Sequence, residues 1–583
     1  RSVSRGLGDV YKRQIKNSLF EGNEVKASSI DNDGGAIIFY QTAGSHNFNI
    51  SSTVFRNNVA RKGRGGAIYS NFLTSSIDSS IFEGNGSASN GGAILYQAGA
   101  NTITGTKFIN NTAGGSAGAI LLYPGASLTI TGSEFSENSA SVHGGALRLE
   151  GGGSVTISDT NFVKNHANAA GGAIDSDRAE AFSVTNSHFD GNTAVTNGGA
   201  IVLWDSTADK TISGSTFTNN SVSATASGGL GGAILHSHGS GIPEGTNGKL
   251  TITDSIFENN SITSTGNAYG GAIAGLNLHI SNSVFRANSS KTYGGAIHVS
   301  YKGTNTVDSS VFEANKAVYG AAISNADSTI NITNSTFKSN ESTYGAVFNY
   351  GNGVMNISDS YFVGNTASSY GGAIYNNNDG GKLTVKNSIF EKNSAVNGGG
   401  AIVNQAIMDI ITEAGKVTRF SENSGGQYST INNSGGGTLN ISVAAGGTMI
   451  FENNSGSYGA LGNYSSAASL TISAKNGSLI DFRGNTATAG AAILNETSNI
   501  FNFTGDTVRF TNNEATSNGG AIRNSGNMAM NITNLEFLGN KASNKGGAIY
   551  NSGTLSLTNA IFKDNTACLL YTSPSPRDTE RSR

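Results

Sequence analysis

The sequence predicts a single right-handed parallel β-helix of about twenty coils, because three short motifs alternate along most of the chain. Phe-x-x-Asn occurs twenty times, and the intervals between its phenylalanines average 28.5 residues. Eighteen of the nineteen intervals contain Gly-Gly-Ala-Ile or a close relative, and the exception is the segment 428–431. A short alternating segment, such as Leu-Thr-Ile at 128–130, precedes each phenylalanine. Period-two segments separated by Gly, Asn and Ser indicate strands rather than helices.

The repeat is too short to fold alone. A unit of about 27 residues with two or three strands cannot close its own core, so it must stack on its neighbours. Parallel strands lie ~4.8 Å apart, so twenty coils would form a rod on the order of 95 Å long. Crossovers between parallel strands are right-handed in about 98% of cases, which gives the predicted hand.

Each repeated residue type has a physical role. One phenylalanine per coil predicts an internal ring stack, in which loss of one ring costs roughly 3–5 kcal/mol. The asparagine three residues later predicts a ladder of side-chain amides. The paired glycines predict a corner with positive φ or close backbone approach, and Ala-Ile begins the next inward-facing strand. Representative ladder positions are Phe20, Phe135, Phe257, Phe390 and Phe562, with Asn23, Asn138, Asn260, Asn393 and Asn565.

A second asparagine ladder is predicted in the later half of the chain. The residue two positions beyond the motif isoleucine varies in the early coils, but it is always asparagine from the eleventh coil onward. Asn433 lies two beyond Ile431, so the degenerate coil keeps its register. The members of this ladder are Asn325, Asn349, Asn376, Asn404, Asn433, Asn463, Asn495, Asn524 and Asn551.

Both ends of the chain differ abruptly in composition from the repeats. The segments 4–14 and 568–578 are encoded by opposite strands of one oligonucleotide, which resembles a transposase-type sequencing adapter. We therefore interpret 1–14 and 568–583 as translated adapter sequence, and 15–567 as the repeat domain, a fragment with both native ends missing. The only cysteine, Cys568, falls outside that domain. A long domain without cysteine suits export through an oxidising compartment, where free thiols would cross-link.

Composition argues against several functional classes. The net charge is -3 and only 13% of residues are charged, which gives no electrostatic reason to expect nucleic-acid binding. No apolar run approaches the ~18 residues of a membrane-spanning helix. The sequence lacks a phosphate loop, a dinucleotide fingerprint and a zinc-spaced cysteine set, so we expect no cofactor and no metal.

The alternation of Phe-x-x-Asn with Gly-Gly-Ala-Ile resembles the polymorphic outer membrane protein repeats of chlamydial-type autotransporters. The resemblance covers essentially all of 15–567. It implies an adhesive passenger, without enzymatic activity, at the bacterial cell surface or outer membrane or secreted. It also implies attachment through a C-terminal β-barrel that would lie beyond this fragment. Related repeats occur in surface proteins without a barrel, so the secretion route stays open.

One charged cluster keeps an enzymatic alternative open. Parallel β-helices also include polysaccharide lyases and hydrolases, which place carboxylates and a basic residue on an exposed strand face, often with Ca²⁺. The best such cluster contains Glu150, Asp175, Asp177, Arg178, Glu180 and Asp205.

A column of outward side chains crosses that cluster. The residues three positions beyond each motif isoleucine, or beyond Leu147, would lie ~5 Å apart in one outward column. They are Asn71, Gln97, Tyr123, Glu150, Asp177 and Trp204. We predict Tyr123, Glu150, Asp177 and Trp204 as a glycan- or partner-contact column without catalytic residues. The alternative is a solvated face with chance clustering.

The longest loop of the chain is predicted to be a surface insertion. It runs from His236 to Glu244 and contains a His-x-His pair. Long loops on rigid scaffolds often carry function, but no third metal ligand follows at a fixed spacing.

The sequence therefore predicts an adhesin and structural stalk whose partner is a protein or glycan of a host or neighbouring cell. A carbohydrate-active β-helix enzyme is the alternative. A second alternative is a self-associating matrix protein, because the strand edges at the ends of a truncated β-helix invite end-to-end stacking.

Overall fold

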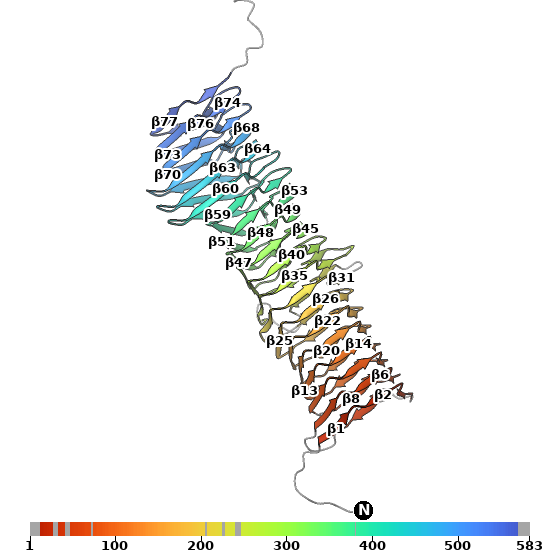
Figure 1. Cartoon of the computed structure of the whole chain (residues 1–583). Coiled ribbons are helices and arrows are strands. Elements are labelled where there is room, and N and C mark those ends of the chain that lie inside the picture. Colours follow the sequence, from red (N-terminus) through yellow and green to blue (C-terminus); the bar gives the residue numbers. More distant parts are fainter. Residues whose placement is uncertain are drawn as a thin grey trace, which may run out of the picture. The chain divides into compact units, whose positions relative to one another are not determined.

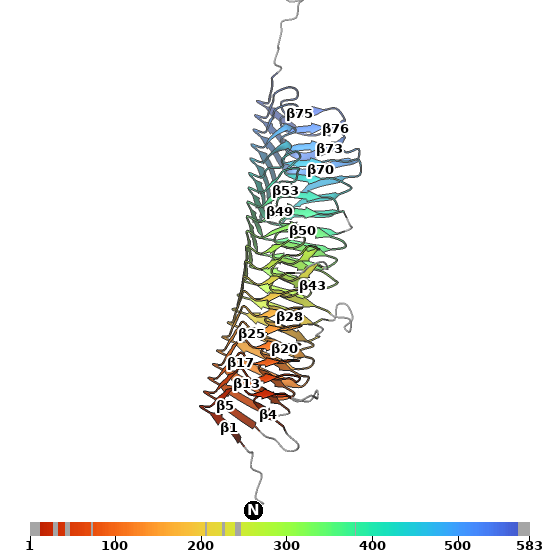
Figure 2. The ribbon, with the colours of Figure 1, turned by 90° about the vertical axis from the view of Figure 1, so that its right-hand side faces the viewer.

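The computed structural model describes residues 12–26, 33–40, 47–71, 74–204, 207–223, 228–238, 247–378 and 381–568. The described residues form strands and no helix, and the paired strands run parallel. The chain forms two compact units, Arg1–Val318 and Tyr319–Arg583. Within each unit the coils stack as a right-handed parallel β-helix, which confirms the predicted fold class (Figures 1 and 2).

One coil shows how the motifs fold. Strand β17 (Ala126–Thr131) is the alternating segment, and β18 (Glu134–Ser136) carries the motif phenylalanine. Strand β19 (Ser139–Ala140) follows the motif asparagine, and β20 (Leu147–Glu150) begins after the glycine corner. The same succession recurs from coil to coil.

The strands that follow the glycine corner form the sheet that positions the candidate site. In the first unit they are β4 (Ile37–Phe39), β8 (Ile68–Ser70), β12 (Ile94–Tyr96), β16 (Ile120–Leu122), β20, β24 (Ile174–Asp177), β28 (Ile201–Trp204), β33 (Ile234–Ser237), β38 (Ile273–Gly275) and β42 (Ile297–Val299). In the second unit they are β46 (Ile323–Ala326), β50 (Val347–Tyr350), β54 (Ile374–Asn376), β58 (Ile402–Asn404), β61 (Ile431–Asn433), β65 (Leu461–Asn463), β69 (Ile493–Asn495), β72 (Ile522–Asn524) and β75 (Ile549–Asn551). The degenerate coil keeps its register, because Asn433 lies beside Asn404.

The predicted phenylalanine stack runs through the buried core of each unit. The fully buried ring of Phe135 lies parallel to those of Phe108 and Phe162, with centroid distances of 4.7 and 4.9 Å. The same stacking includes Phe20 and Phe257 in the first unit, and Phe390 and Phe562 in the second. Parallel rings at one strand spacing pack in contact with one another along the stack.

Both predicted asparagine ladders are present. The Asn138 Nδ2 donates to Asn165 Oδ1 and to the carbonyl oxygen of Phe108, each at 2.9 Å. The first ladder also includes Asn23, Asn260, Asn393 and Asn565. The second includes Asn325, Asn376, Asn463 and Asn551, with amide-to-amide distances of 2.7–3.2 Å. Each amide thereby satisfies buried polar groups of adjacent coils.

The two glycines of the corner serve different needs. Gly144 has a φ of +64°, a region that residues with a Cβ rarely adopt. At Gly145 an added Cβ would lie 2.0 Å from the carbonyl oxygen of Gly172 in the next coil. The corner therefore combines positive φ with close backbone approach, as the sequence predicted.

A second buried layer, which the sequence did not predict, lies outside the main core. It is formed by the residue after most of the motif isoleucines and by residues at or just before the glycine corner. We call it the outer layer. One of its clusters contains Tyr69, Leu95, Ala117 and Leu121, and another contains Ala170, Val202, Leu235 and Ala274. Both are buried because the chain before each corner folds back over the strand after it.

The first strand begins before the predicted domain boundary at residue 15. Strand β1 (Lys12–Lys16) pairs in parallel with β5 (Asn47–Ser51), so residues 12–14 extend a ladder. Backbone pairing depends little on side chains, so the pairing does not test the proposed adapter origin of 1–14.

Candidate functional site

A hollow of about 510 Å³ opens where β20 and β24 end, in the first unit. Its lining combines four charged side chains with a proline and two glycines. We call it the charged hollow, and its residues are Pro124, Arg148, Glu150, Gly151, Gly152, Asp177 and Arg178. Gly151 and Gly152 have φ values of +68° and +56°, so the chain turns sharply after Glu150 without presenting side chains. The volume lies in the range of small-molecule sites.

The predicted contact column passes through this hollow. Glu150 lies beside Asp177, and Asp177 lies beside Trp204, in consecutive strands. Each of these three side chains is half-buried. The register therefore brings Glu150, Asp177 and Trp204 together as predicted, with Glu150 and Asp177 lining the hollow itself.

The two aromatic members of the column pack on separate apolar clusters. Tyr123 lies on the outer-layer cluster of Leu121, and its hydroxyl oxygen accepts a hydrogen bond of 3.4 Å from Arg64 Nη1. Trp204 lies on the outer-layer cluster of Val202. Tyr123 and Trp204 thus flank the hollow on either side without lining it.

A largely buried ion pair, with a histidine beside it, lies next to the hollow. The Arg148 guanidinium pairs with Asp175, and His143 Nδ1 lies 3.3 Å from Asp175 Oδ2. Asp175 is 0% exposed, although the sequence placed it on an exposed face. That prediction was wrong because Asp175 follows the motif isoleucine and belongs to the outer layer, where its Cβ lies 2.7 Å from the position of a Cβ at Gly171.

The other members of the charged cluster have different environments. Arg178 Nη2 lies 3.1 Å from Asp177 Oδ2, and Glu180 is exposed. Asp205 lies outside the described residues. The sequence missed Arg148 and Pro124 as lining residues, because the two preceding coils hold leucine at the position of Arg148, which therefore gave no site signal.

The two histidines of the long loop do not converge. His236 is buried inside the coil, and its Nδ1 lies 2.8 Å from the carbonyl oxygen of Leu276, which requires Nδ1 to be the donor. Burial chiefly, with the nearby charge of Lys210, lowers the pKa of His236 to about 3. His238 instead packs its ring edge-on against Tyr301. Residues 239–246, which include most of the loop, lie outside the described residues.

The described residues contain no group of three or more His, Cys, Asp or Glu side chains arranged to hold a metal. Within the same part of the chain, no helix is long and apolar enough to span a membrane.

Comparison with known proteins identifies the repeats. The family described as the right handed beta helix region matches residues 41–240 and 118–312. The Chlamydia polymorphic membrane protein repeat matches 359–377, 387–405, 507–525 and 534–552. Each of these four segments contains one Phe-x-x-Asn and one Gly-Gly-Ala-Ile. The second unit therefore carries repeats of the Chlamydia polymorphic membrane protein type.

Other comparisons add little to these two family matches. No curated protein sequence matches the chain. Two solved structures of the PL6 family alginate lyase AlyGC, one of them a mutant, align at 9% identity with TM-scores of 0.21 and 0.16. The alignments cover 96% and 94% of this chain, and 97% of each lyase chain. Similarity this low carries no argument about activity.

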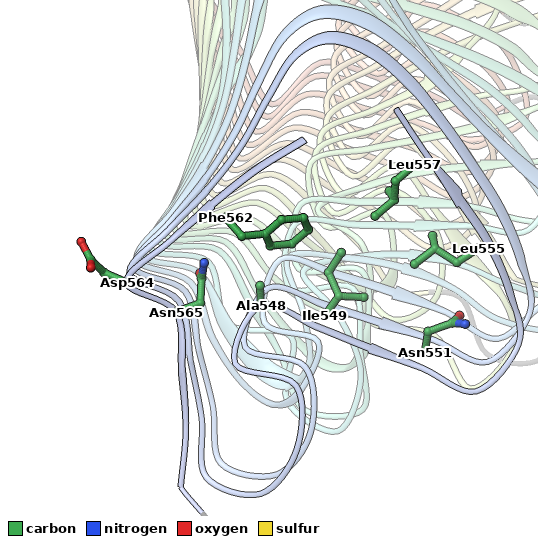
Figure 3. A pocket seen from close by; sticks show the side chains of 8 residues that line it. All are labelled: Ala548, Ile549, Asn551, Leu555, Leu557, Phe562, Asp564 and Asn565. Carbon is green, nitrogen blue, oxygen red and sulfur yellow. The ribbon is translucent and has the colours of Figure 1, made fainter. Parts of the chain in front are cut away.

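A second hollow lies at the last described coil of this repeat protein (Figure 3). Its lining side chains stand at the positions that stack as ladders in earlier coils: Phe562 lies on Phe537, and Asn551 bonds to Asn524. Phe562 is 50% exposed, whereas Phe537 is fully buried. This hollow is therefore the uncovered face of the repeat core rather than a separately built site.

Proposed function

We propose that this repeat protein is a bacterial surface or secreted passenger that acts as an adhesin and structural stalk, without catalysis. Its support is the family of its repeats and a core whose ladders run from coil to coil. The adhesive function is supported by the charged hollow. The pairing of neighbouring strands holds its side chains in place, and its volume suits a small ligand. Strands that hold their side chains at fixed spacing give a preorganised contact surface.

The proposed partner is a protein or glycan on a host or neighbouring cell. The contact surface is the charged hollow with its flanking Trp204. Polar residues beside a half-buried indole are typical of sugar-binding surfaces, where the ring contacts an apolar sugar face and the polar groups bond to hydroxyls.

The test is binding of residues 15–567 to an array of glycans and matrix proteins, with an assay for uronic-acid product on the same plate. We expect saturable binding without product, lost when Trp204→Ala is combined with Asp177→Ala. The control is Tyr350→Ala, an aromatic residue at the same coil position in the second unit, which should bind normally. Product release would contradict the non-catalytic proposal, and an array on which nothing binds would contradict the adhesive one.

A further inference from the structure

The arginines of the charged hollow are already paired. Arg148 pairs with the buried Asp175, and its Nη2 lies 4.0 Å from Asp177 Oδ2. Arg178 lies 3.1 Å from the same carboxylate oxygen. A ligand carboxylate, as in a uronic sugar, would have to compete with these pairs for each guanidinium.

The carboxylate of Glu150 is the group left without a partner. It lines the hollow and lies in register with Asp177, yet it makes no ion pair or hydrogen bond with any described residue. Glu180 adds a second carboxylate at the rim, 3.9 Å from the position of a Cβ at Gly152. The six charged groups of this region are two guanidiniums and four carboxylates, so the net formal charge of the region is negative. They are Arg148, Arg178, Glu150, Asp175, Asp177 and Glu180.

The lining of the hollow leaves room for a sugar ring. Gly151 and Gly152 leave its floor without side chains, and the Pro124 ring lies 3.6 Å from the position of a Cβ at Gly151. The indole of Trp204 lies in the strand next to that of Asp177. One strand spacing, ~4.8 Å, is close to the length of one pyranose unit, so consecutive sugars can contact consecutive coils.

We propose that the charged hollow binds the primary ammonium group of an amino sugar within a glycan chain. The carboxylate of Glu150 accepts hydrogen bonds from the ammonium, while Pro124 and Trp204 contact the apolar faces of the sugar rings. Charge-assisted bonds of this kind are stronger than bonds between neutral groups. The inference rests on the proposed glycan-binding function and names the sugar class.

Trp204 is the only tryptophan of the chain, so its fluorescence reports directly on ligands at this face. The probe is a glucosamine oligomer with free amines, titrated at about pH 6, where an aliphatic amine near the α-amino range is charged. We expect a saturable change in Trp204 fluorescence. The N-acetylated oligomer and a uronate oligomer should bind at least about tenfold more weakly, a difference of about 1.4 kcal/mol.

The decisive variant is Glu150→Gln, which keeps the shape and removes the charge. We expect about a tenfold loss of affinity for the glucosamine oligomer, and the same loss for the unaltered protein above about pH 9, where the amine is neutral. The matched control is Glu137→Gln, an exposed change of equal charge outside the hollow, which should leave affinity unchanged.

Several outcomes would overturn the inference. Equal affinity for the N-acetylated oligomer, or unchanged affinity in Glu150→Gln, would show that the ammonium is not recognised. Tighter binding of an oligolysine peptide would assign the hollow to a basic protein partner. Binding of only neutral or acidic glycans at Trp204 would reject the amino-sugar class and leave the adhesive function standing, whereas silence toward every glycan and protein would reject both.

Discussion

At the scale of single residues, stability rests on positions that repeat once per coil. Phe135 is fully buried between two parallel rings, so Phe135→Ala removes both stacking contacts and leaves a cavity that the coils above and below cannot close. We expect a loss of roughly 3–5 kcal/mol in the free energy of unfolding, measured by urea denaturation. Val142→Ala, at a 39% exposed position, is the control and should cost little.

The ladder asparagine gives a second test at this scale. Asn138 donates to Asn165 Oδ1 and to the Phe108 carbonyl, and its own Oδ1 accepts from the backbone N–H of Asn111. Asn138→Leu removes the partner of the Phe108 carbonyl oxygen and of both the backbone N–H and the Nδ2 of Asn111, and each buried polar group that loses its bond costs about 1–3 kcal/mol. We expect a loss of at least about 3 kcal/mol in the free energy of unfolding. A loss below about 1 kcal/mol would show that water replaces the ladder.

Buried histidines make the first unit sensitive to acid. The folded-state pKa values of His236 and His298 are lowered by burial from 6.5 to about 3. Between those values the unfolded chain binds more protons than the folded one, so stability is retained above pH 6.5 and falls as the pH drops toward 3. Over this range each histidine lowers the free energy of unfolding by up to about 1.4 kcal/mol for every pH unit of acidification.

The variant that tests this slope is His236→Leu, because Leu203 occupies the same position in the neighbouring strand. Urea denaturation between pH 6.5 and 4 should show a shallower loss of stability in this variant than in the parent chain. Parallel pH profiles for the two proteins would contradict the role of His236.

At the scale of the elements, the outer layer explains what the sequence could and could not predict. Motif spacing sufficed for the fold, both asparagine ladders and the register of Glu150, Asp177 and Trp204, because each depends only on position within a coil. The burial of Asp175 did not follow, since strand alternation alone points it toward solvent. Nor did the packing of Tyr123, whose ring lies 5.9 Å from the guanidinium carbon of Arg64, two coils away in sequence. Both depend on how the segment before each corner folds back, which has no spacing signal.

For the ion pair of Arg148 and Asp175 in that layer, we expect removal of one partner to lower the stability, and replacement of both partners by apolar residues to preserve or raise it. Asp175→Ala leaves the Arg148 guanidinium, whose side chain is 13% exposed, without its buried partner, and should cost about 3–5 kcal/mol. The double variant Arg148→Leu with Asp175→Val restores the apolar layer of the flanking Leu121 and Val202, and should be neutral or stabilising by about 1–4 kcal/mol. A double variant less stable than Asp175→Ala would show that the pair stabilises the fold. Urea denaturation of the three proteins decides this.

At the scale of the whole molecule, a repeat stack has no natural stopping point, because every coil presents the surface that the next coil covers. In the last described coil that surface includes Leu555, Leu557 and the half-exposed ring of Phe562 (Figure 3). Apolar side chains beside unpaired strands favour association with a similar surface. A chain spanning 15–567 is therefore expected to associate end to end, with light scattering that rises with protein concentration. Leu557→Lys places a charge in this face and should weaken the association, whereas Ile500→Lys, at a 61% exposed position, should not. Equal scattering from both variants would mean that the chains associate through their sides, and the end of the stack would then have no part in assembly.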